Sequence, residues 1–354
     1  MNRWLDTLVA LLEQGQPAVL VTVAACQGST PREPGARMIV GRDMFSGTIG
    51  GGQLEWRATA HARDLITAGN HQPELVRYPL GARLGQCCGG VVHLAFEPLD
   101  SNALPWLRRA HELAMTGLPW GRLVGLAGER TQCRVFGSQP EDSLDDSALI
   151  SLARELLAGH GDRARLLSRQ GLASVLIDVS MPPSLEVMLF GAGHVGSALA
   201  DILHHQPLRL RWIDSREEAD AVPQRERRGL IESDDPVAEV DCASPGTTFV
   251  VMTQSHALDF DLVRAILRRE DFRYCGLIGS TSKRAGFIAR LRERGFDDTL
   301  LDRLRCPIGI EGIFGKEPEV IAVAVAAEIL ALRTPASVVA SARPAALPKD
   351  AIRV

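Results

Sequence analysis

The sequence predicts an α/β protein with a C-terminal Rossmann-like, doubly wound parallel sheet and an N-terminal α/β domain. From residue 185 onward, short apolar runs alternate with amphipathic segments, a pattern typical of parallel strands connected by helices. A G-x-G-x-x-G motif, from Gly191 to Gly196, directly follows the first of these runs and opens a predicted helix. The chain has 354 residues, which is long enough for two or three domains.

The N-terminal elements are predicted from short apolar runs bounded by turn residues and from amphipathic runs with helix-ending glycines. Helices are expected at 2–14 and 54–67, the second ended by Gly69, and strands at 18–25, 38–40, 74–78 and 91–96. In the middle region we expect helices at 103–116 and 147–158, and a hairpin formed by 122–126 and 132–136.

The C-terminal elements follow a stiff Met-Pro-Pro-Ser break at 181–184. Strands are expected at 185–190, 208–213, near 230, 249–252 and 274–278, and helices at 194–204, 258–268, 282–294 and 318–332. The predicted organisation is a motif-bearing domain 1–98, a middle region 99–183 of unclear role, a Rossmann-like domain 184–333 and a loosely ordered tail 334–354.

Composition excludes several classes of function. The net charge is −4 and aromatic residues make up 5% of the chain, so neither a global positive field nor base-stacking platforms for nucleic acid are expected. The apolar run Val320–Ala327 is too short to span a bilayer, so no membrane partner is expected. Seven cysteines without a C-x-x-C pair predict neither a four-thiolate zinc site nor a disulfide framework, and favour a reducing, cytoplasmic location.

The glycine motif suggests a phosphate-binding turn. Gly191 would permit the tight turn, Gly193 would let backbone N–H groups approach a phosphate, and Gly196 would allow close packing of helix on strand. Asp214 closes the next strand, where a ribose hydroxyl would be recognised, and Arg216 could instead face a phosphate. The alternative is a Rossmann-like fold that binds no nucleotide.

Two N-terminal loops carry polar and glycine-rich runs. In the first, which two prolines stiffen, Gly28, Ser29, Thr30 and Arg32 offer hydroxyls and a guanidinium fork, which suits a phosphate or a carbonyl edge. In the second, Gly50, Gly51 and Gly52 precede a helix and present backbone donors to an anion. The alternatives are a solvated surface turn and a plain loop.

Two further motifs hold thiols and cations. Cys87 and Cys88 are flanked by glycines, so a thiolate there could ligate a soft metal or carry sulfur, or both could be small buried residues at a turn. Ser280 and Lys283 follow a strand end of the predicted Rossmann sheet and could face a ligand, although Ser280 could simply cap the helix.

Taken together, six ordered motifs resemble the XdhC family, also called XdhC/CoxI, whose members are accessory proteins of xanthine dehydrogenase maturation. The motifs are GSTPREPGARMIV, GTIGGGQLEW, LGQCCGG, LFGAGHVGSALA, GLIGSTSKRAGF, and CPIGI with KEPEVIAVAVAAEIL, between Val19 and Leu332. One departure concerns Thr253-Gln254-Ser255-His256, where the family often shows Thr-His-x-His, and it puts a role for the first histidine in doubt.

The resemblance implies a protein that binds the molybdenum cofactor, a molybdenum-carrying pterin with a phosphate, in the domain 1–98. A cysteine desulfurase would supply the terminal sulfur, and the cofactor would pass to the molybdenum subunit of xanthine dehydrogenase. It also implies that the loops at 28–32 and 50–52 shape the pocket, that Cys87 or Cys88 lies near the molybdenum, and that the glycines at 191–196 lie near a phosphate.

Three hypotheses remain open from sequence. The first is a cofactor chaperone without turnover of its own, for which NAD(P) is not needed. The second is an NAD(P)-dependent oxidoreductase that uses Asp214, and the third is a purely protein-binding subunit. A homodimer is expected from the nearly all-apolar last helix.

Overall fold

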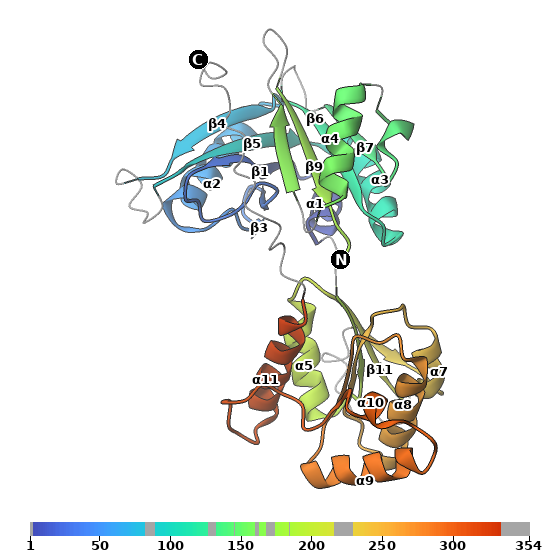
Figure 1. The fold of residues 1–354 in the computed structure, drawn as a ribbon. Coiled ribbons are helices and arrows are strands. Elements are labelled where there is room, and N and C mark those ends of the chain that lie inside the picture. Colours follow the sequence, from blue (N-terminus) through green and yellow to red (C-terminus); the bar gives the residue numbers. More distant parts are fainter. Residues whose placement is uncertain are drawn as a thin grey trace. The chain divides into compact units, whose positions relative to one another are not determined.

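The computed structural model describes residues 3–81, 89–126, 132–144, 146–159, 163–167, 174–183, 185–215 and 229–333. They form two compact units divided after Pro182, and each unit is described by itself (Figure 1). The described residues of the middle region up to Pro182, a region without a predicted role, pack in the same unit as the described residues of the predicted domain 1–98.

The first unit contains two antiparallel sheets. A five-stranded sheet has the order β3-β2-β1-β5-β4, and a four-stranded sheet has the order β7-β6-β9-β8. The strands are β1 (Ala18–Gln27), β2 (Arg37–Val40), β3 (Phe45–Gly47), β4 (Glu74–Pro79), β5 (Val91–Leu99), β6 (Trp120–Gly125), β7 (Gln132–Phe136), β8 (Arg163–Leu167) and β9 (Val175–Ser180).

In the described part of this unit, four helices and two short 3₁₀ turns accompany the sheets. They are α1 (Arg3–Glu13), α2 (Gly52–Ala68), η2 (Ser101–Ala103), α3 (Leu104–Met115), η3 (Pro140–Asp142) and α4 (Ser147–Leu157). As predicted, Gly69 ends α2 in the left-handed conformation (φ 61°) and donates its N–H to Ile66.

The central strand β1 is buried on both faces, which explains its continuous apolar run. Val19 and Val21 pack with Leu54 of α2 on one face. Leu20 packs on the other face, with Leu8 of α1 and with residues of α3. The second sheet adds a further cluster against the end of β1, and α4 covers its outer side. The described part of the unit is therefore layered, with β1 at its centre.

The sequence analysis missed β8 and β9. In β9 the residues from Leu176 to Ser180 are all buried, so no alternation marks an outer face, while two arginines interrupt the apolar pattern of the five-residue β8. Both strands form because β9 pairs with β6 on one side and with β8 on the other. These two strands therefore form because they pair with strands distant in the sequence, and not because of their local residue pattern.

A buried ion network joins the two sheets. The Arg122 guanidinium donates to both Glu97 carboxylate oxygens, at 2.7 and 2.9 Å, and to Asp178, and all three side chains are at most 1% exposed. The rings of Trp4 and Trp106 each lie with their centre 5.5 Å from the guanidinium carbon. Although burial alone lowers it, the carboxylates of Asp178 and Glu97 hold the pKa of Arg122 well above its usual value.

The second unit is a six-stranded parallel sheet with the order β12-β11-β10-β13-β14-β15. In chain order this is 3-2-1-4-5-6, the strand order of the Rossmann fold. The strands are β10 (Glu186–Phe190), β11 (Arg209–Asp214), β12 (Leu230–Glu232), β13 (Thr248–Val251), β14 (Tyr274–Leu277) and β15 (Leu304–Arg305). The predicted doubly wound parallel sheet is confirmed.

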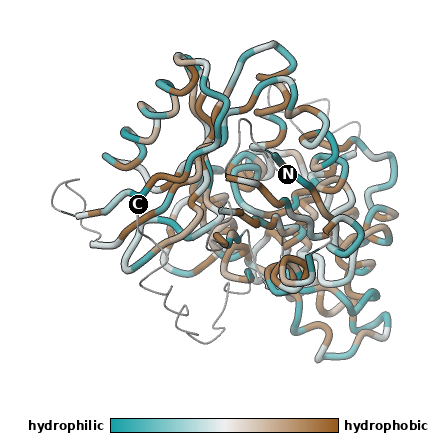
Figure 2. Tube along the Cα trace, turned by 90° about the horizontal axis from the view of Figure 1, so that it is seen from above, coloured by the Kyte–Doolittle hydropathy of each residue, from teal (hydrophilic) through white to brown (hydrophobic). Residues whose placement is uncertain are grey.

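Helices lie on both faces of this sheet. One core cluster packs α5 and α11 on one face, and the other packs α7, α8, α9 and α10 on the opposite face (Figure 1). Their bounds are α5 (His194–His204), α7 (Pro236–Asp241), α8 (His256–Arg269), α9 (Thr281–Arg292), α10 (Asp298–Leu301) and α11 (Pro318–Ala331). Along the trace, several helices alternate between hydrophobic and hydrophilic residues (Figure 2).

Candidate functional site

Two side chains stabilise the loop after β1 by donating hydrogen bonds to the same backbone carbonyl. Thr30 Oγ1 and Cys26 Sγ both donate to the Arg32 carbonyl oxygen, at 3.2 and 3.3 Å. Gly28 has φ 72°, a conformation that glycine adopts without strain. The Arg32 side chain is 38% exposed, and its guanidinium lies 3.6 Å from the Glu33 carboxylate. The loop therefore has a fixed backbone and an accessible cation.

The glycine-rich loop before α2 already holds an anion. Oxygen Oε2 of Glu55 accepts from Thr48 Oγ1 at 2.6 Å, from the Ile49 N–H at 3.1 Å and from the Gly51 N–H at 3.2 Å. The Gly50 N–H is used by Thr48 Oγ1 at 3.1 Å. Of the three predicted donors, the Gly51 N–H is therefore bound by a carboxylate of the same chain and the Gly50 N–H by the Thr48 hydroxyl.

Three loops meet at this place. A Cβ atom on Gly50 would lie 2.6 Å from Pro31 Cγ, so the second loop touches the first. Gly90 donates its N–H to the Ser29 carbonyl at 3.1 Å, and a Cβ atom on Gly90 would lie 2.5 Å from that oxygen. A Cβ atom on Gly28 would lie 3.3 Å from the Gly90 Cα. The backbones of the first and third loops are in van der Waals contact, which only glycine permits.

The structure therefore brings Gly28, Ser29, Thr30 and Arg32 together with the loop of Gly50, Gly51 and Gly52. Cys87 and Cys88 lie outside the described residues, directly before Gly89 and Gly90. The sequence analysis gave no role to Cys26, Glu55 or Gly90. The last two stood inside the quoted motifs, while nothing but its position just before Gly28 marked Cys26.

Cys26 is a thiol rather than a thiolate at neutral pH. Burial raises its pKa by more than a side-chain hydrogen bond with Thr30 lowers it, and the nearby Glu33 carboxylate raises it further. A protonated thiol donates to the Arg32 carbonyl and is a poor metal ligand. Its role in this conformation is to close the loop.

The glycine turn of the second unit has the geometry that the fingerprint predicts. Gly191 has φ 118° and lies so close to the Met252 backbone that a Cβ atom would be 2.7 Å from its carbonyl carbon. A Cβ atom on Gly196 would lie 3.0 Å from the Gly191 carbonyl carbon, so this glycine permits the close approach of α5 to the turn. The turn lies between β10 and β13, where the strand order reverses.

Asp214 is 1% exposed, and both of its carboxylate oxygens are used within the chain. One accepts the Ala192 N–H inside the glycine turn, and the other accepts the Ser215 N–H at 2.8 Å. In this conformation the carboxylate is not presented to a ribose hydroxyl, so the site does not fit the usual recognition of NAD(P). The nucleotide role of Asp214 stays a prediction.

The Lys283 side chain likewise forms an ion pair with a residue of its own unit. Its Nζ lies 2.6 Å from Asp259 Oδ2, and Asp259 also accepts from the Thr253 hydroxyl at 2.8 Å. Ser280 accepts the Lys283 N–H at 3.2 Å and caps α9. Asp259 is fully buried, so the Lys283 ammonium compensates its charge. The roles of Ser280 and Lys283 towards a ligand remain predictions.

Replacing Asp214 with alanine should destabilise the protein without any ligand present. The change leaves the buried Ala192 N–H and the Ser215 N–H without their acceptor, which costs about 2 kcal/mol in the free energy of unfolding. Urea unfolding measures this, with Asp201→Ala on the exposed side of α5 as the control. Equal stability of the two variants would contradict a structural role for the Asp214 carboxylate.

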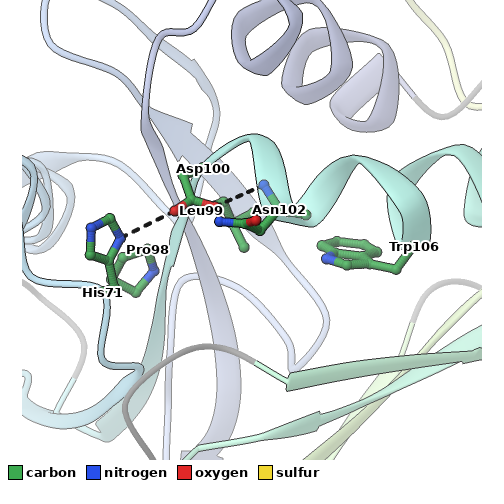
Figure 3. A pocket seen from close by; sticks show the side chains of 7 residues that line it. His71, Pro98, Leu99, Asp100, Asn102 and Trp106 are labelled. Atoms are coloured by element: carbon green, nitrogen blue, oxygen red, sulfur yellow. Dashed lines mark hydrogen bonds and ion pairs between the residues drawn. The ribbon is translucent and has the colours of Figure 1, made fainter.

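One described pocket of the first unit, of about 330 Å³ including open solvent at its mouth, lies away from these loops. It is lined by His71, Pro98, Leu99, Asp100, Asn102, Ala103 and Trp106, none of them a predicted site residue (Figure 3). His71 Nδ1 lies 3.6 Å from Asp100 Oδ2. Within the described residues, no group of three or more His, Cys, Asp or Glu side chains could hold a metal ion. Among these residues, no helix is both long and apolar enough to cross a bilayer.

The fold and the loops define a two-unit α/β protein whose second unit is a Rossmann domain. Residues 187–329 match the model of the XdhC Rossmann domain, and residues 11–79 match that of the XdhC and CoxI family. The chain belongs to the XdhC family.

Two relatives cover nearly the whole chain. One, a probable xanthine dehydrogenase subunit from Bacillus subtilis, is 22% identical over 96% of this chain and all of its own length. The other is the crystal structure of a xanthine dehydrogenase from Bacillus halodurans, which matches with a TM-score of 0.67 and 20% identity, over 94% of this chain and 97% of that one. This second match shows a shared fold.

Proposed function

We propose that this protein is an accessory protein of xanthine dehydrogenase that binds the molybdenum cofactor as its cargo. It holds the cofactor while a cysteine desulfurase supplies the terminal sulfur, and then transfers it to the molybdenum subunit. The membership of the XdhC family and the name of the Bacillus subtilis relative support a maturation role. We expect no independent turnover.

The observation that carries the proposal is the meeting of the three loops at 28–32, 50–52 and 89–90. The cargo combines a phosphate, a flat pterin and a metal that favours thiolates. The Arg32 guanidinium is exposed and not fixed in a buried ion pair, so it can bind the phosphate or a pterin carbonyl by two parallel hydrogen bonds. The exposed Ser29 and the hydroxyl of Thr30 border the same loop.

The proposal also assigns roles to the vicinal thiols and to the glycine turn of the second unit. Because Gly90 lies against the first loop, the vicinal thiols Cys87 and Cys88 are within three residues of this contact along the chain. Either thiolate would then be available as a molybdenum ligand or as a carrier of sulfur. The glycines at 191–196 are proposed to lie near a phosphate, and the chain is proposed to act as a homodimer.

The decisive experiment identifies the cargo. The full chain, purified without oxygen, is denatured, and the released pterin and metal are identified. We expect molybdopterin and molybdenum from the wild type, and a loss of affinity of at least tenfold, about 1.4 kcal/mol, in Arg32→Ala. Arg63→Ala, an exposed arginine of α2, is the matched control. In Cys87→Ala and Cys88→Ala, unchanged retention and sulfuration would remove the thiols from the mechanism.

Two outcomes would overturn the proposal. Release of NAD or NADP without a pterin would favour an oxidoreductase. The Rossmann strand order permits that function, but the Asp214 carboxylate binds the Ala192 N–H and is not free to bind a ribose. Release of no ligand at all, with unchanged binding of partner proteins, would favour a purely protein-binding subunit.

A further inference from the structure

The second unit displays a cluster of exposed apolar side chains, which we call the Phe314 patch. It consists of Ile310, Ile313 and Phe314 in the segment after β15 and Val323 on α11, exposed by 38%, 37%, 91% and 49%. Of the described second unit, Ile231 at 38% is the remaining exposed large hydrophobic residue. A phenylalanine so exposed keeps nearly all its apolar surface in water, which is unfavourable unless a partner covers it.

Contacts with α11 hold the backbone of the patch in place. The Ile310 N–H donates to the Ala324 carbonyl of α11 at 3.2 Å, and the Gly309 N–H donates to the Glu328 carboxylate. A Cβ atom on Gly315 would lie 2.8 Å from Val320 Cγ1, so the segment also packs against the first turn of α11. The segment is thus attached to α11 on both sides of Phe314, and the exposed ring does not belong to a loose terminus.

The rim of the patch is acidic. Within residues 310–319, Glu311, Glu317 and Glu319 are exposed, against one exposed cation, Lys316. Arg305 lies nearby but is paired with Glu328, with Nε 2.9 Å from Oε1. In a twofold contact between two copies, these like-charged rims would face each other, which is unfavourable. The charge of the rim therefore favours a different protein with a basic rim.

We infer that the Phe314 patch is the docking surface for a protein partner that offers an apolar socket bordered by lysine or arginine side chains. Resting on the proposed function, we assign this partner as the molybdenum subunit of xanthine dehydrogenase. Phe314 is the anchor that fills the socket, because aromatic side chains at the centre of an interface carry much of its binding energy. The glutamates around it steer the basic partner and increase the association rate.

The test measures binding of the full chain to the purified cofactor-free molybdenum subunit by calorimetry. Phe314→Ala should weaken the Kd at least tenfold, and Ile231→Ala, with the same kind of exposed apolar side chain on β12, should change it less than twofold. Cofactor retention should be unchanged in both variants, because none of the proposed cofactor residues lies in the patch. Unchanged binding of Phe314→Ala would overturn the inference while leaving the proposed function intact.

The charge of the rim gives a second, independent measurement. Glu311→Lys combined with Glu319→Lys should weaken binding and reverse its salt dependence, whereas binding of the wild type should weaken as ionic strength rises. A wild type that does not bind the molybdenum subunit would overturn both the assigned partner and the proposed function. A Phe314→Ala chain that turns from dimer to monomer in solution would identify a second copy as the occupant and overturn the inference.

Discussion

Replacing Arg122 with methionine is expected to lower the free energy of unfolding by about 3–5 kcal/mol. The guanidinium is fully buried between the Glu97 and Asp178 carboxylates, so its removal leaves two buried acidic groups without a strong counter-charge. Arg37 compensates for this charge only in part, because its Nη2 lies 4.0 Å from Asp178, against 2.7 Å for Arg122 Nη2. Urea unfolding monitored by circular dichroism measures the loss.

The loss of stability in Arg122→Met should depend on pH. Burial raises the pKa of Glu97, and Arg122 is the main opposing influence, so the pKa rises further in the variant. A carboxyl group whose pKa is higher in the folded state than in the unfolded state binds protons more tightly when folded, and acidification then favours the folded protein. The difference between wild type and Arg122→Met should therefore shrink as the pH falls from 8 towards about 5.

Two controls make this prediction specific. Arg108→Met removes an exposed arginine whose Nη2 lies 3.0 Å from Glu13, and it should change stability little. Adding Glu97→Gln and Asp178→Asn to Arg122→Met should recover part of the lost stability, because no buried charge then lacks a partner. An Arg122→Met chain as stable as Arg108→Met would contradict the role of the buried network.

Changing Gly90 to alanine is expected to reduce cofactor retention by at least tenfold, whereas changing the adjacent Gly89 should reduce it less than twofold. A Cβ atom on Gly90 would lie 2.5 Å from the Ser29 carbonyl oxygen and still closer to that of Gln27, while a Cβ atom on Gly89 meets nothing within 4 Å. Both glycines have φ values open to alanine. The two variants differ in steric contact with the first loop, next to the same cysteines.

The measurement is the pterin and molybdenum content after purification without oxygen. The overpacking at Gly90 should also cost about 1–3 kcal/mol of stability, so unfolding curves are recorded alongside. A folded Gly90→Ala protein that retains as much cofactor as Gly89→Ala would show that close contact between the first and third loops is not needed for binding. That result would contradict the proposed site.

The second unit was the easier part to predict, because its signals are local. Most strands of the parallel sheet are short apolar runs next to a helix, and the predicted helix 194–204 has the bounds observed for α5. Pro318 in the first turn of α11 marks the start of the last helix. Short elements such as α7, α10 and β15 escaped prediction because six, four and two residues are too few to show a period.

The candidate site was only partly predictable. The glycines and Arg32 could be named, because glycine-rich turns and guanidinium groups have a recognised use at anionic ligands. That Glu55 binds the donors of its own glycine loop, and that Asp214 binds those of the turn at 191–193, was not visible in the sequence. Asp214 stood at a recognised position and Glu55 inside a quoted motif, but only the folded backbone places each carboxylate against the N–H groups that it binds.

The amino-acid sequence by itself determined the strand–helix order of the Rossmann unit, the glycine turns and the family to which the chain belongs, because each depends on residues close together along the chain. Tertiary structure alone decided that Gly28 and Gly90 are in contact and that Glu97, Arg122 and Asp178 share one buried network. The physical reason is strand pairing. Since β1 pairs with β5, and β6 with β9, residues dozens of positions apart come within a few ångströms, and no local pattern encodes that distance.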